Sequence, residues 1–169
     1  MQEDECRTAD WREVGLRDGL AGRPSSTLAS YHEACSKHGI VPDGDVYREG
    51  RAEGLTGYCV LDNAVSEGLA GRRYQGVCPV EVDRSFRELN DAGYAVYTVR
   101  EEMDDVYGKI DSLENELADD DTTEERRAAF RDELRKLDRA IGRLRDDLRW
   151  KERELDRVTA ALIPANPSR

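Results

Sequence analysis

Four cysteines are the residues of this chain whose chemistry is most constrained by their placement. Cys6, Cys35, Cys59 and Cys78 all lie in the first half of the chain, at separations of 29, 24 and 19 residues. None belongs to a Cys-x-x-Cys pair, so the spacing disfavours a zinc knuckle or ribbon. An even number of cysteines in a small segment with a modest core is typical of a disulfide-stapled domain in an oxidising compartment. Of the three possible pairings we favour Cys6–Cys35 and Cys59–Cys78, because each would join ends of neighbouring helices.

A metal site is the alternative use of one of these cysteines. His32, Cys35 and His38 follow one another at steps of three residues, which places them on one side of a helix. Two imidazoles and a thiolate can bind zinc or copper. The fourth ligand is not specified, and a disulfide at Cys35 would remove the thiolate. We therefore expect no metal or other cofactor and keep these three residues as an alternative.

No arrangement typical of an enzyme occurs in the sequence. There is no Gly-x-Ser-x-Gly motif, phosphate-binding loop or His-Glu-x-x-His motif, and there are only two histidines. A glycan-acting or peptidoglycan-acting enzyme would need paired carboxylates in a cleft, for which Asp10, Asp18 and Glu53 are the candidates. We interpret these acids as solvated helix residues or arginine partners and expect the protein not to be an enzyme.

Aromatic residues beside the glycines of the first 80 residues suggest a binding groove. Together with a charged pair they could line a shallow cleft for a peptide or a glycan. The alternative is that they form the core of a small domain, which the matching positions of Trp11 and Tyr47 ahead of glycines favour. The candidate groove consists of Trp11, Asp18, Tyr47, Arg51, Tyr58 and Tyr74.

An internal repeat organises the segment that carries these residues. The pattern small-x-x-acid-Gly-Leu-small-Gly occurs at residues 15–22, 50–57 and 64–71. A glycine inside a helix costs about 1 kcal/mol relative to alanine, so its repetition predicts close backbone approach between short helices. The last glycine of each copy (Gly22, Gly57 or Gly71) is expected to end its helix in a left-handed conformation. Four short helices are expected, at about residues 10–21, 26–37, 45–56 and 63–70.

Apolar residues after residue 81 recur at alternating steps of three and four, which is the heptad pattern of a two-helix seam. The stripes of residues 89–117 and 130–162 come into register when the second helix folds back on the first, with Ile110 opposite Leu137. An acidic turn at residues 119–121 would join the helices, and Thr122 with Glu125 would form a capping box.

These patterns predict an all-α protein with a glycine-rich, disulfide-stapled helical head followed by a long antiparallel coiled-coil hairpin. The head comprises residues 1–80, the hairpin residues 81–163 and a polar tail residues 164–169. Because this hairpin buries little by itself, a second copy or the head is expected to cover one of its sides.

The net charge of the chain limits the classes of partner that it is expected to bind. A net charge of −11 argues against binding to nucleic acid or to anionic lipid. No stretch approaches the roughly 20 apolar residues that a membrane-crossing helix needs. Residues 81–121 carry a net charge of −10 and residues 122–169 a net charge of +3, a difference that favours pairing of the two hairpin helices.

The head also contains a recognisable series of fixed residues. It reads Cys6-x3-Asp10-Trp11-x3-Gly15-x2-Asp18-Gly19-x2-Gly22, then Tyr47-x2-Gly50-Arg51-x2-Gly54-Leu55-x2-Tyr58-Cys59, and Gly68-x2-Gly71-x2-Tyr74-x-Gly76-Val77-Cys78-Pro79. Over about residues 6–80 this resembles the domain-of-unknown-function family 2799, small secreted or lipid-anchored proteins of Gram-negative bacteria. The resemblance implies export to the periplasm and often an outer-membrane lipoprotein anchor. It implies no activity and no catalytic residue.

We therefore expect a non-enzymatic interaction or scaffold protein of the cell envelope, with the hairpin as an arm for partner binding or self-association. A periplasmic metal-binding protein is the second expectation and an envelope glycan-acting enzyme the third.

Overall fold

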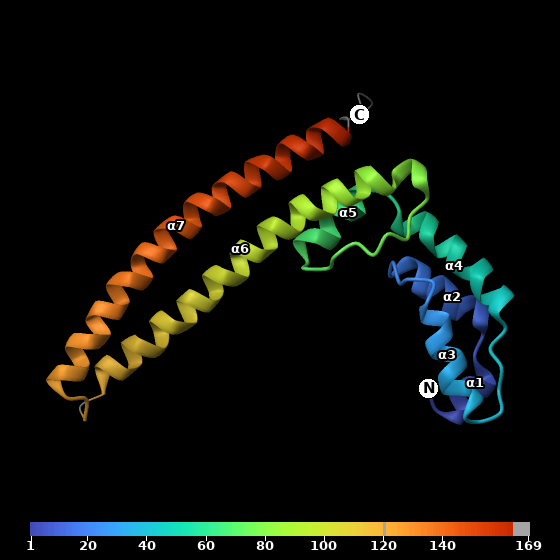
Figure 1. The fold of residues 1–169 in the computed structure, drawn as a ribbon, viewed down its shortest axis with the longest axis horizontal. Helices are drawn as coiled ribbons and strands as arrows, with labels where there is room; N and C mark the ends of the chain where they lie inside the picture. The colour runs from blue at the N-terminus through green and yellow to red at the C-terminus, as the bar shows by residue number, and fades with distance from the viewer. Residues whose placement is uncertain (120, 164–169) are drawn as a thin grey trace.

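The computed structural model describes residues 1–119 and 121–163, and these residues form seven helices. No strand occurs among them, so the expectation of an all-helical protein is confirmed. Figure 1 shows the short helices gathered at one end of the molecule and two long helices extending away from them. The helices are α1 (Glu3–Thr8), α2 (Trp11–Leu20), α3 (Thr27–Ser36), α4 (Gly44–Tyr58), α5 (Leu61–Leu69), α6 (Val80–Ala118) and α7 (Glu124–Leu162).

Two aspartates fix where the main helices of the head begin. The Asp10 carboxylate accepts hydrogen bonds from the backbone N–H groups two and three residues later, at 3.0 and 3.1 Å. Asp43 does the same at the start of α4. These bonds satisfy donors that the first turn of a helix leaves without partners. Helices α2 to α5 match the four short helices expected from the sequence, whereas α1 is additional.

Helices α2 and α4 cross with their backbones in contact, because glycines stand at the crossing. A Cβ atom added to Gly19 would lie 2.9 Å from the Gly54 Cα. A Cβ on Gly15 or Gly50 would overlap a carbonyl group of the facing helix. The predicted close approach at the repeated glycines is therefore confirmed for this pair. Gly15 lies near Gly50 and Gly19 near Gly54, so the two helices run parallel.

Helix α5 and the first part of α6 repeat this arrangement. Gly68 faces Gly93, and a Cβ on Gly93 would lie 3.3 Å from the Gly68 Cα. The third repeat thus packs against a glycine inside the long helix rather than against another repeat. Helix α6 is the second helix of this pair before it continues into the long extension.

Gly22 and Gly71 end α2 and α5 in the left-handed conformation, with φ of 62° and 76°. This confirms the prediction for these two glycines. The prediction for Gly57 is wrong, because α4 continues through it and its φ is not positive. The ring of Tyr58 covers Gly22, and the ring of Tyr97 covers Gly71 in the same way.

The two helix pairs correspond residue by residue. Residues 15–23 match 64–72, and residues 47–58 match 86–97. An Arg–acid ion pair follows each left-handed glycine, between Arg23 and Asp18 in one pair and between Arg72 and Glu67 in the other. The second helix also donates a side-chain hydrogen bond to the carbonyl of each of these arginines, from Arg51 and from Asn90. One structural solution is therefore used twice.

Each helix pair has its own apolar core. The boundary predicted at residue 80 falls within the second core, because α5 packs on α6. The first core contains Cys6, Trp11, Val14, Leu28, Cys35 and Tyr47. The second contains Tyr58, Ala64, Tyr74, Phe86, Leu89 and Val158.

Helices α6 and α7 have 39 residues each and pack side by side. Figure 1 shows α7 returning alongside α6 in the opposite direction. Arg127 of α7 donates to the Leu117 carbonyl at 2.7 Å where the chain turns. Thr123 caps the start of α7, and its hydroxyl accepts from the Arg126 N–H. The capping box predicted for Thr122 with Glu125 is therefore wrong, because the capping residue is Thr123 and the residue three positions later is an arginine.

Asp120 of the predicted acidic turn and the predicted polar tail, residues 164–169, lie outside the described residues. Among the helices that are described, none has an apolar stretch of the length that crossing a bilayer requires.

Candidate functional site

Asp18 is a carboxylate buried inside the first helix pair, where it is 5% exposed. The Tyr47 hydroxyl donates to it at 2.7 Å, and the Tyr31 hydroxyl donates at 3.3 Å. Burial and the bond to Asp18 both disfavour the phenolate, so they raise the pKa of Tyr47 well above its usual value. These bonds connect α2, α3 and α4, and we interpret Asp18 as a structural group.

The six residues of the predicted binding groove do not meet in one groove. Trp11 and Tyr47 lie in the first core and Tyr58 and Tyr74 in the second, and none of the four is more than 9% exposed. The Arg51 side chain donates to the Arg23 backbone carbonyl. These aromatic residues occupy core positions, as the alternative interpretation of the sequence predicted. Large rings fill the space beside helices that glycines bring together.

Tyr74 joins the second core to the start of α6. Its ring centroid lies 4.7 Å from that of Phe86, and its hydroxyl donates to Asp83 at 2.6 Å. The same hydroxyl accepts from the Cys78 N–H at 2.8 Å. Burial and the bond to Asp83 raise the pKa of Tyr74 to about 12. The bond from Tyr74 lowers the pKa of Asp83 in turn.

The acids considered for an enzyme have separate structural partners. Asp10 caps α2, Asp18 accepts from two tyrosines, and Glu53 pairs with Arg12 across the α2–α4 crossing. The structure therefore does not assemble them as a carboxylate pair around a cleft.

The alternative metal site at His32, Cys35 and His38 has no free thiolate. Cys35 is bonded to Cys6, so only the imidazoles of His32 and His38 remain of the three residues. Among the described residues, no group of three or more His, Cys, Asp or Glu side chains has the arrangement of a metal site.

The two disulfides have the pairing favoured from the sequence, Cys6–Cys35 and Cys59–Cys78. Each joins a cysteine ahead of the first helix of a pair to one ahead of the second. Cys6 and Cys35 are almost fully buried. Cys59 and Cys78 instead border a largely apolar groove of about 540 Å³.

Partly exposed apolar residues follow one another along the two long helices. We call residues 100–118 of α6 and 124–151 of α7 the distal arm. Nearer the head the stripe is buried, as at Val96, Val99 and Val158. In the distal arm only Ile141 of the stripe is buried among the described residues. The partly buried stripe residues are Met103, Val106, Ile110, Leu113, Leu117, Phe130, Leu134, Leu137, Leu144 and Leu148.

One side of the distal arm is closed by bonds between the helices. Arg100 pairs with Glu152 at 2.9 Å, and Arg145 donates to the Tyr107 hydroxyl at 2.8 Å. All four residues directly follow a stripe position, so they share one edge of the seam. We call this the bridged edge.

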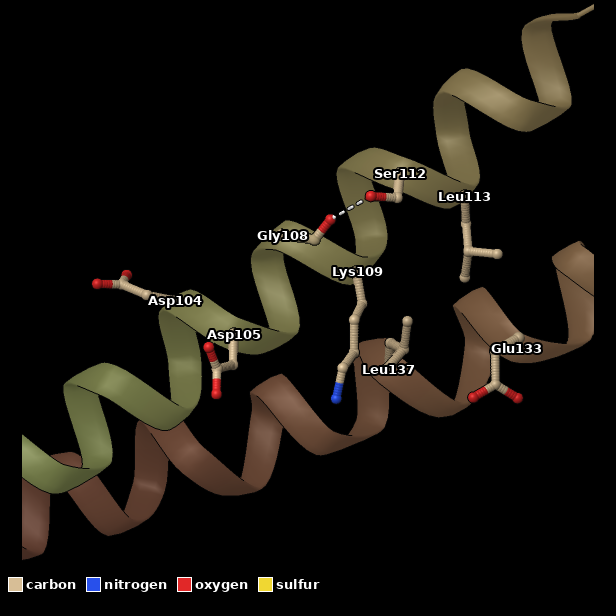
Figure 2. Close-up of a pocket in the computed structure, with 8 residues that line it drawn as sticks. All are labelled: Asp104, Asp105, Gly108, Lys109, Ser112, Leu113, Glu133 and Leu137. Atoms are coloured by element: carbon tan, nitrogen blue, oxygen red, sulfur yellow. Dashed lines mark hydrogen bonds between the residues drawn. The ribbon is translucent and has the colours of Figure 1, made fainter.

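The opposite side of the two long helices, which we call the open edge, extends along α6 from residue 91 to residue 118 and contains two grooves between α6 and α7. One, of about 460 Å³, is lined by residues that include Asp105, Gly108 and Lys109 of α6 and Glu133 of α7. Figure 2 shows Lys109 and Leu113 reaching from α6 toward the helix that carries Glu133 and Leu137. The other, of about 500 Å³, lies nearer the head and is lined by Arg73, Asp91, Tyr94, Ala95, Thr98, Val99, Glu102, Asp147 and Lys151.

Trp150 lies on the open edge and is 52% exposed. It is three residues from Asp147, which lines the second groove, and residues at this spacing share a helix face. From the sequence, Trp150 lies beside the apolar stripe and is a candidate for the surface that a second copy or the head covers, but it belongs to no predicted groove. Its size and its position between charged neighbours were the available signal.

A comparison with known protein families gives a match over both helix pairs. The model described as "Protein of unknown function (DUF2799)" matches residues 10–95. That range contains the glycine crossings of both helix pairs and stops before the distal arm. No curated protein and no solved structure matches the chain. Because the match spans just over half of the chain, the resemblance seen in the sequence is confirmed, and the chain belongs to the DUF2799 family.

Proposed function

We propose that this chain is a non-enzymatic interaction or scaffold protein of the bacterial cell envelope, and that its distal arm is an antiparallel coiled coil that binds a protein partner. The observation that carries this proposal is the apolar stripe of the distal arm, whose residues are only partly buried although the same stripe is buried nearer the head. Contiguous apolar surface of this kind marks sites of protein interaction. The exposed ring of Trp150 beside the stripe adds a residue type that is enriched in interfaces.

The two disulfides support a location outside the cytosol, because such bonds persist in oxidising compartments such as the periplasm. Within this proposal the protein resides in the periplasm, and an outer-membrane lipoprotein anchor is the form of attachment that the family resemblance implies.

The two helix pairs supply the rigid base that an arm of this length requires. Gly93 fixes α6 against α5 by direct backbone contact, and Cys78 ties the start of α6 to the end of α4. The base therefore sets the direction in which the arm projects.

Shortening the arm tests this role directly. Deletion of residues 104–117 together with residues 130–143 removes two heptads from each helix and preserves the phase of the stripe. We expect the shortened chain to keep its two disulfides and helical circular dichroism but to lose its partner contacts in cells. A shortened chain with unchanged contacts would exclude the arm as the binding element.

Site-specific photo-crosslinking identifies where contacts are made. A crosslinking amino acid at Trp150 or Lys109, both on the open edge, is expected to give discrete protein adducts in the cell envelope. The control position is Val41, which is 76% exposed but lies on the head. Adducts of equal yield at Val41 and on the arm, or none at either arm position, would contradict the proposal.

A further inference from the structure

We propose that the open edge of the distal arm binds a second copy of this chain, so that two arms form a four-helix bundle. This inference rests on the proposed function and names its partner. Three observations carry it: the charge difference between the two arm helices, the two grooves on the open edge, and the exposed Trp150 beside one of them.

The arm helices carry opposite charge. Residues 100–118 contain seven acidic and two basic side chains, whereas residues 124–151 contain seven acidic and ten basic ones. In a dimer, the acidic α6 segment and the basic α7 segment each face opposite charge only if α6 of one copy lies against α7 of the other. Contact of α6 with α6 would place like charges together, which disfavours that arrangement.

This pairing determines the symmetry of the dimer. A two-fold axis parallel to the arm places α6 against α7 of the second copy in antiparallel orientation. An axis perpendicular to the arm within the interface would place α6 against α6. The charges therefore favour two arms that point the same way, with both heads at one end.

The symmetry in turn determines which residues meet. The ion pairs Arg100–Glu152 and Arg126–Glu116 set the register of α6 against α7 within one chain. In that register Asp105 stands level with residues 142 and 143. A two-fold axis parallel to the arm preserves this level, so Asp105 of one copy meets Arg143 of the other.

The same register accounts for Trp150. It stands level with Thr98, which lines the groove nearer the head. In the dimer the Trp150 ring of each copy would therefore cover that groove in the other copy. Tryptophans that fill a groove at an interface commonly contribute much of the binding energy.

The bridged edge does not offer the same surface, because Arg100 and Arg145 already link the two helices there. Among the described residues the open edge has one such link, Arg126 with Glu116, and it lies at the tip. From residue 91 to residue 118 the open edge extends about 42 Å at 1.5 Å per residue. With a width of about 20 Å for two packed helices, it presents roughly 800 Å² per copy, as in a standard stable interface.

Charge reversal with complementation tests the contact. In sedimentation experiments on the purified, oxidised full chain we expect a dimer whose dissociation constant rises with salt. Asp105→Arg alone and Arg143→Asp alone should each raise that constant about tenfold or more, because two symmetric attractions become repulsions. Mixing the two variants should restore dimerisation, since every facing pair in the mixed dimer has opposite charges. Failure of the mixture to recover would overturn the assigned contact.

A steric pair of variants tests the edge. Gly108 lines the first groove and Gly142 lies three residues before Arg145 of the bridged edge, and a Cβ on either glycine would meet nothing within 4 Å. Gly108→Trp should block dimerisation, whereas Gly142→Trp should not. The reverse result would overturn the choice of edge.

Tryptophan fluorescence supplies an independent signal. Trp11 is buried, so a blue shift of emission on dimerisation would report Trp150. We expect this shift as concentration rises, and Trp150→Phe should abolish it and weaken the dimer. A chain that stays monomeric at all concentrations would overturn this inference. If the arm is still needed for crosslinking in cells, the proposed function stands with a different protein as partner.

Discussion

Gly19 and Gly54 face each other where α2 crosses α4, and a Cβ atom on Gly19 would approach the Gly54 Cα to 2.9 Å. The backbone carbonyl of Arg51 lies still closer to that Cβ position. Neither obstacle is the mobile end of a side chain. The crossing therefore has no room for a methyl group unless one helix moves.

Gly19→Ala should destabilise the protein by about 2 kcal/mol, because overpacking of a tight contact exceeds the gain in helix propensity. Gly142→Ala is the matched control, since Gly142 lies inside a helix with nothing within 4 Å of its Cβ position. It should stabilise the protein by up to about 1 kcal/mol. Urea unfolding followed by circular dichroism measures both changes. Equal effects of the two substitutions would contradict the close approach.

Asn90→Ala should lower stability by about 2–4 kcal/mol. The Asn90 side chain is fully buried, accepts from the Tyr74 N–H at 2.8 Å and donates to the carbonyls of Ala64 and Arg72. Removing it deletes its hydrogen bonds to three backbone groups, of which the Tyr74 N–H is buried. Asp91→Ala, at an exposed neighbouring position, should change stability by less than about 0.5 kcal/mol. Equal unfolding midpoints for the two variants would show that this network contributes little.

The two disulfides should differ in their reactivity toward a soluble thiol. Thiol–disulfide exchange requires the attacking thiolate to reach a sulfur atom. Cys59 and Cys78 border a groove, whereas Cys6 and Cys35 are almost fully buried. Graded reduction, alkylation and mass spectrometry should therefore detect labelled Cys59 and Cys78 first. Simultaneous labelling of all four cysteines would indicate global unfolding instead.

Stability should fall as the pH rises above about 10. In the unfolded chain a tyrosine has a pKa of 10.0, whereas in the folded protein the pKa of Tyr74 is about 12. The unfolded state therefore releases its proton first, and the stabilisation present below pH 10 is lost between pH 10 and pH 12. Tyr74→Phe removes this contribution. Between pH 10 and pH 12 it should reduce the slope of the free energy of unfolding against pH by about 1 kcal/mol per pH unit. Urea unfolding at pH 8.0, about 10 and about 11 measures the slope, with Tyr107→Phe as the exposed control.

Sequence patterns specified much of the head because each depended on local chemistry. The repeated glycines indicated backbone contact, and the positions of the cysteines favoured the two pairings that the structure has. The partner of the third repeat could not be predicted, since Gly93 stands in a segment with a heptad pattern and no copy of the repeat. Its contact with Gly68 depends on tertiary packing.

The predicted binding groove shows a second limit. An aromatic residue beside a glycine can line a cleft or fill a core, and the residue types are the same in both cases. The matching positions of Trp11 and Tyr47 ahead of glycines favoured the core, but which of the two cores each aromatic residue joins depends on how the helix pairs close. The sequence places Trp150 beside the stripe, but the groove near it could not be predicted, because its lining comes from segments that are far apart in sequence.

Helix α6 belongs to two structures at once, since Gly93 fixes it in the second helix pair while its later residues form the arm. From Gly93 to Ala118 it extends about 38 Å at 1.5 Å per residue. A tilt of about 10° between α5 and α6 would displace the far end by about 7 Å, given that length. The helix therefore couples the head to the tip mechanically. A small rotation at the glycine crossing would produce a larger displacement at the tip, and a force applied at the tip would exert a torque on the crossing.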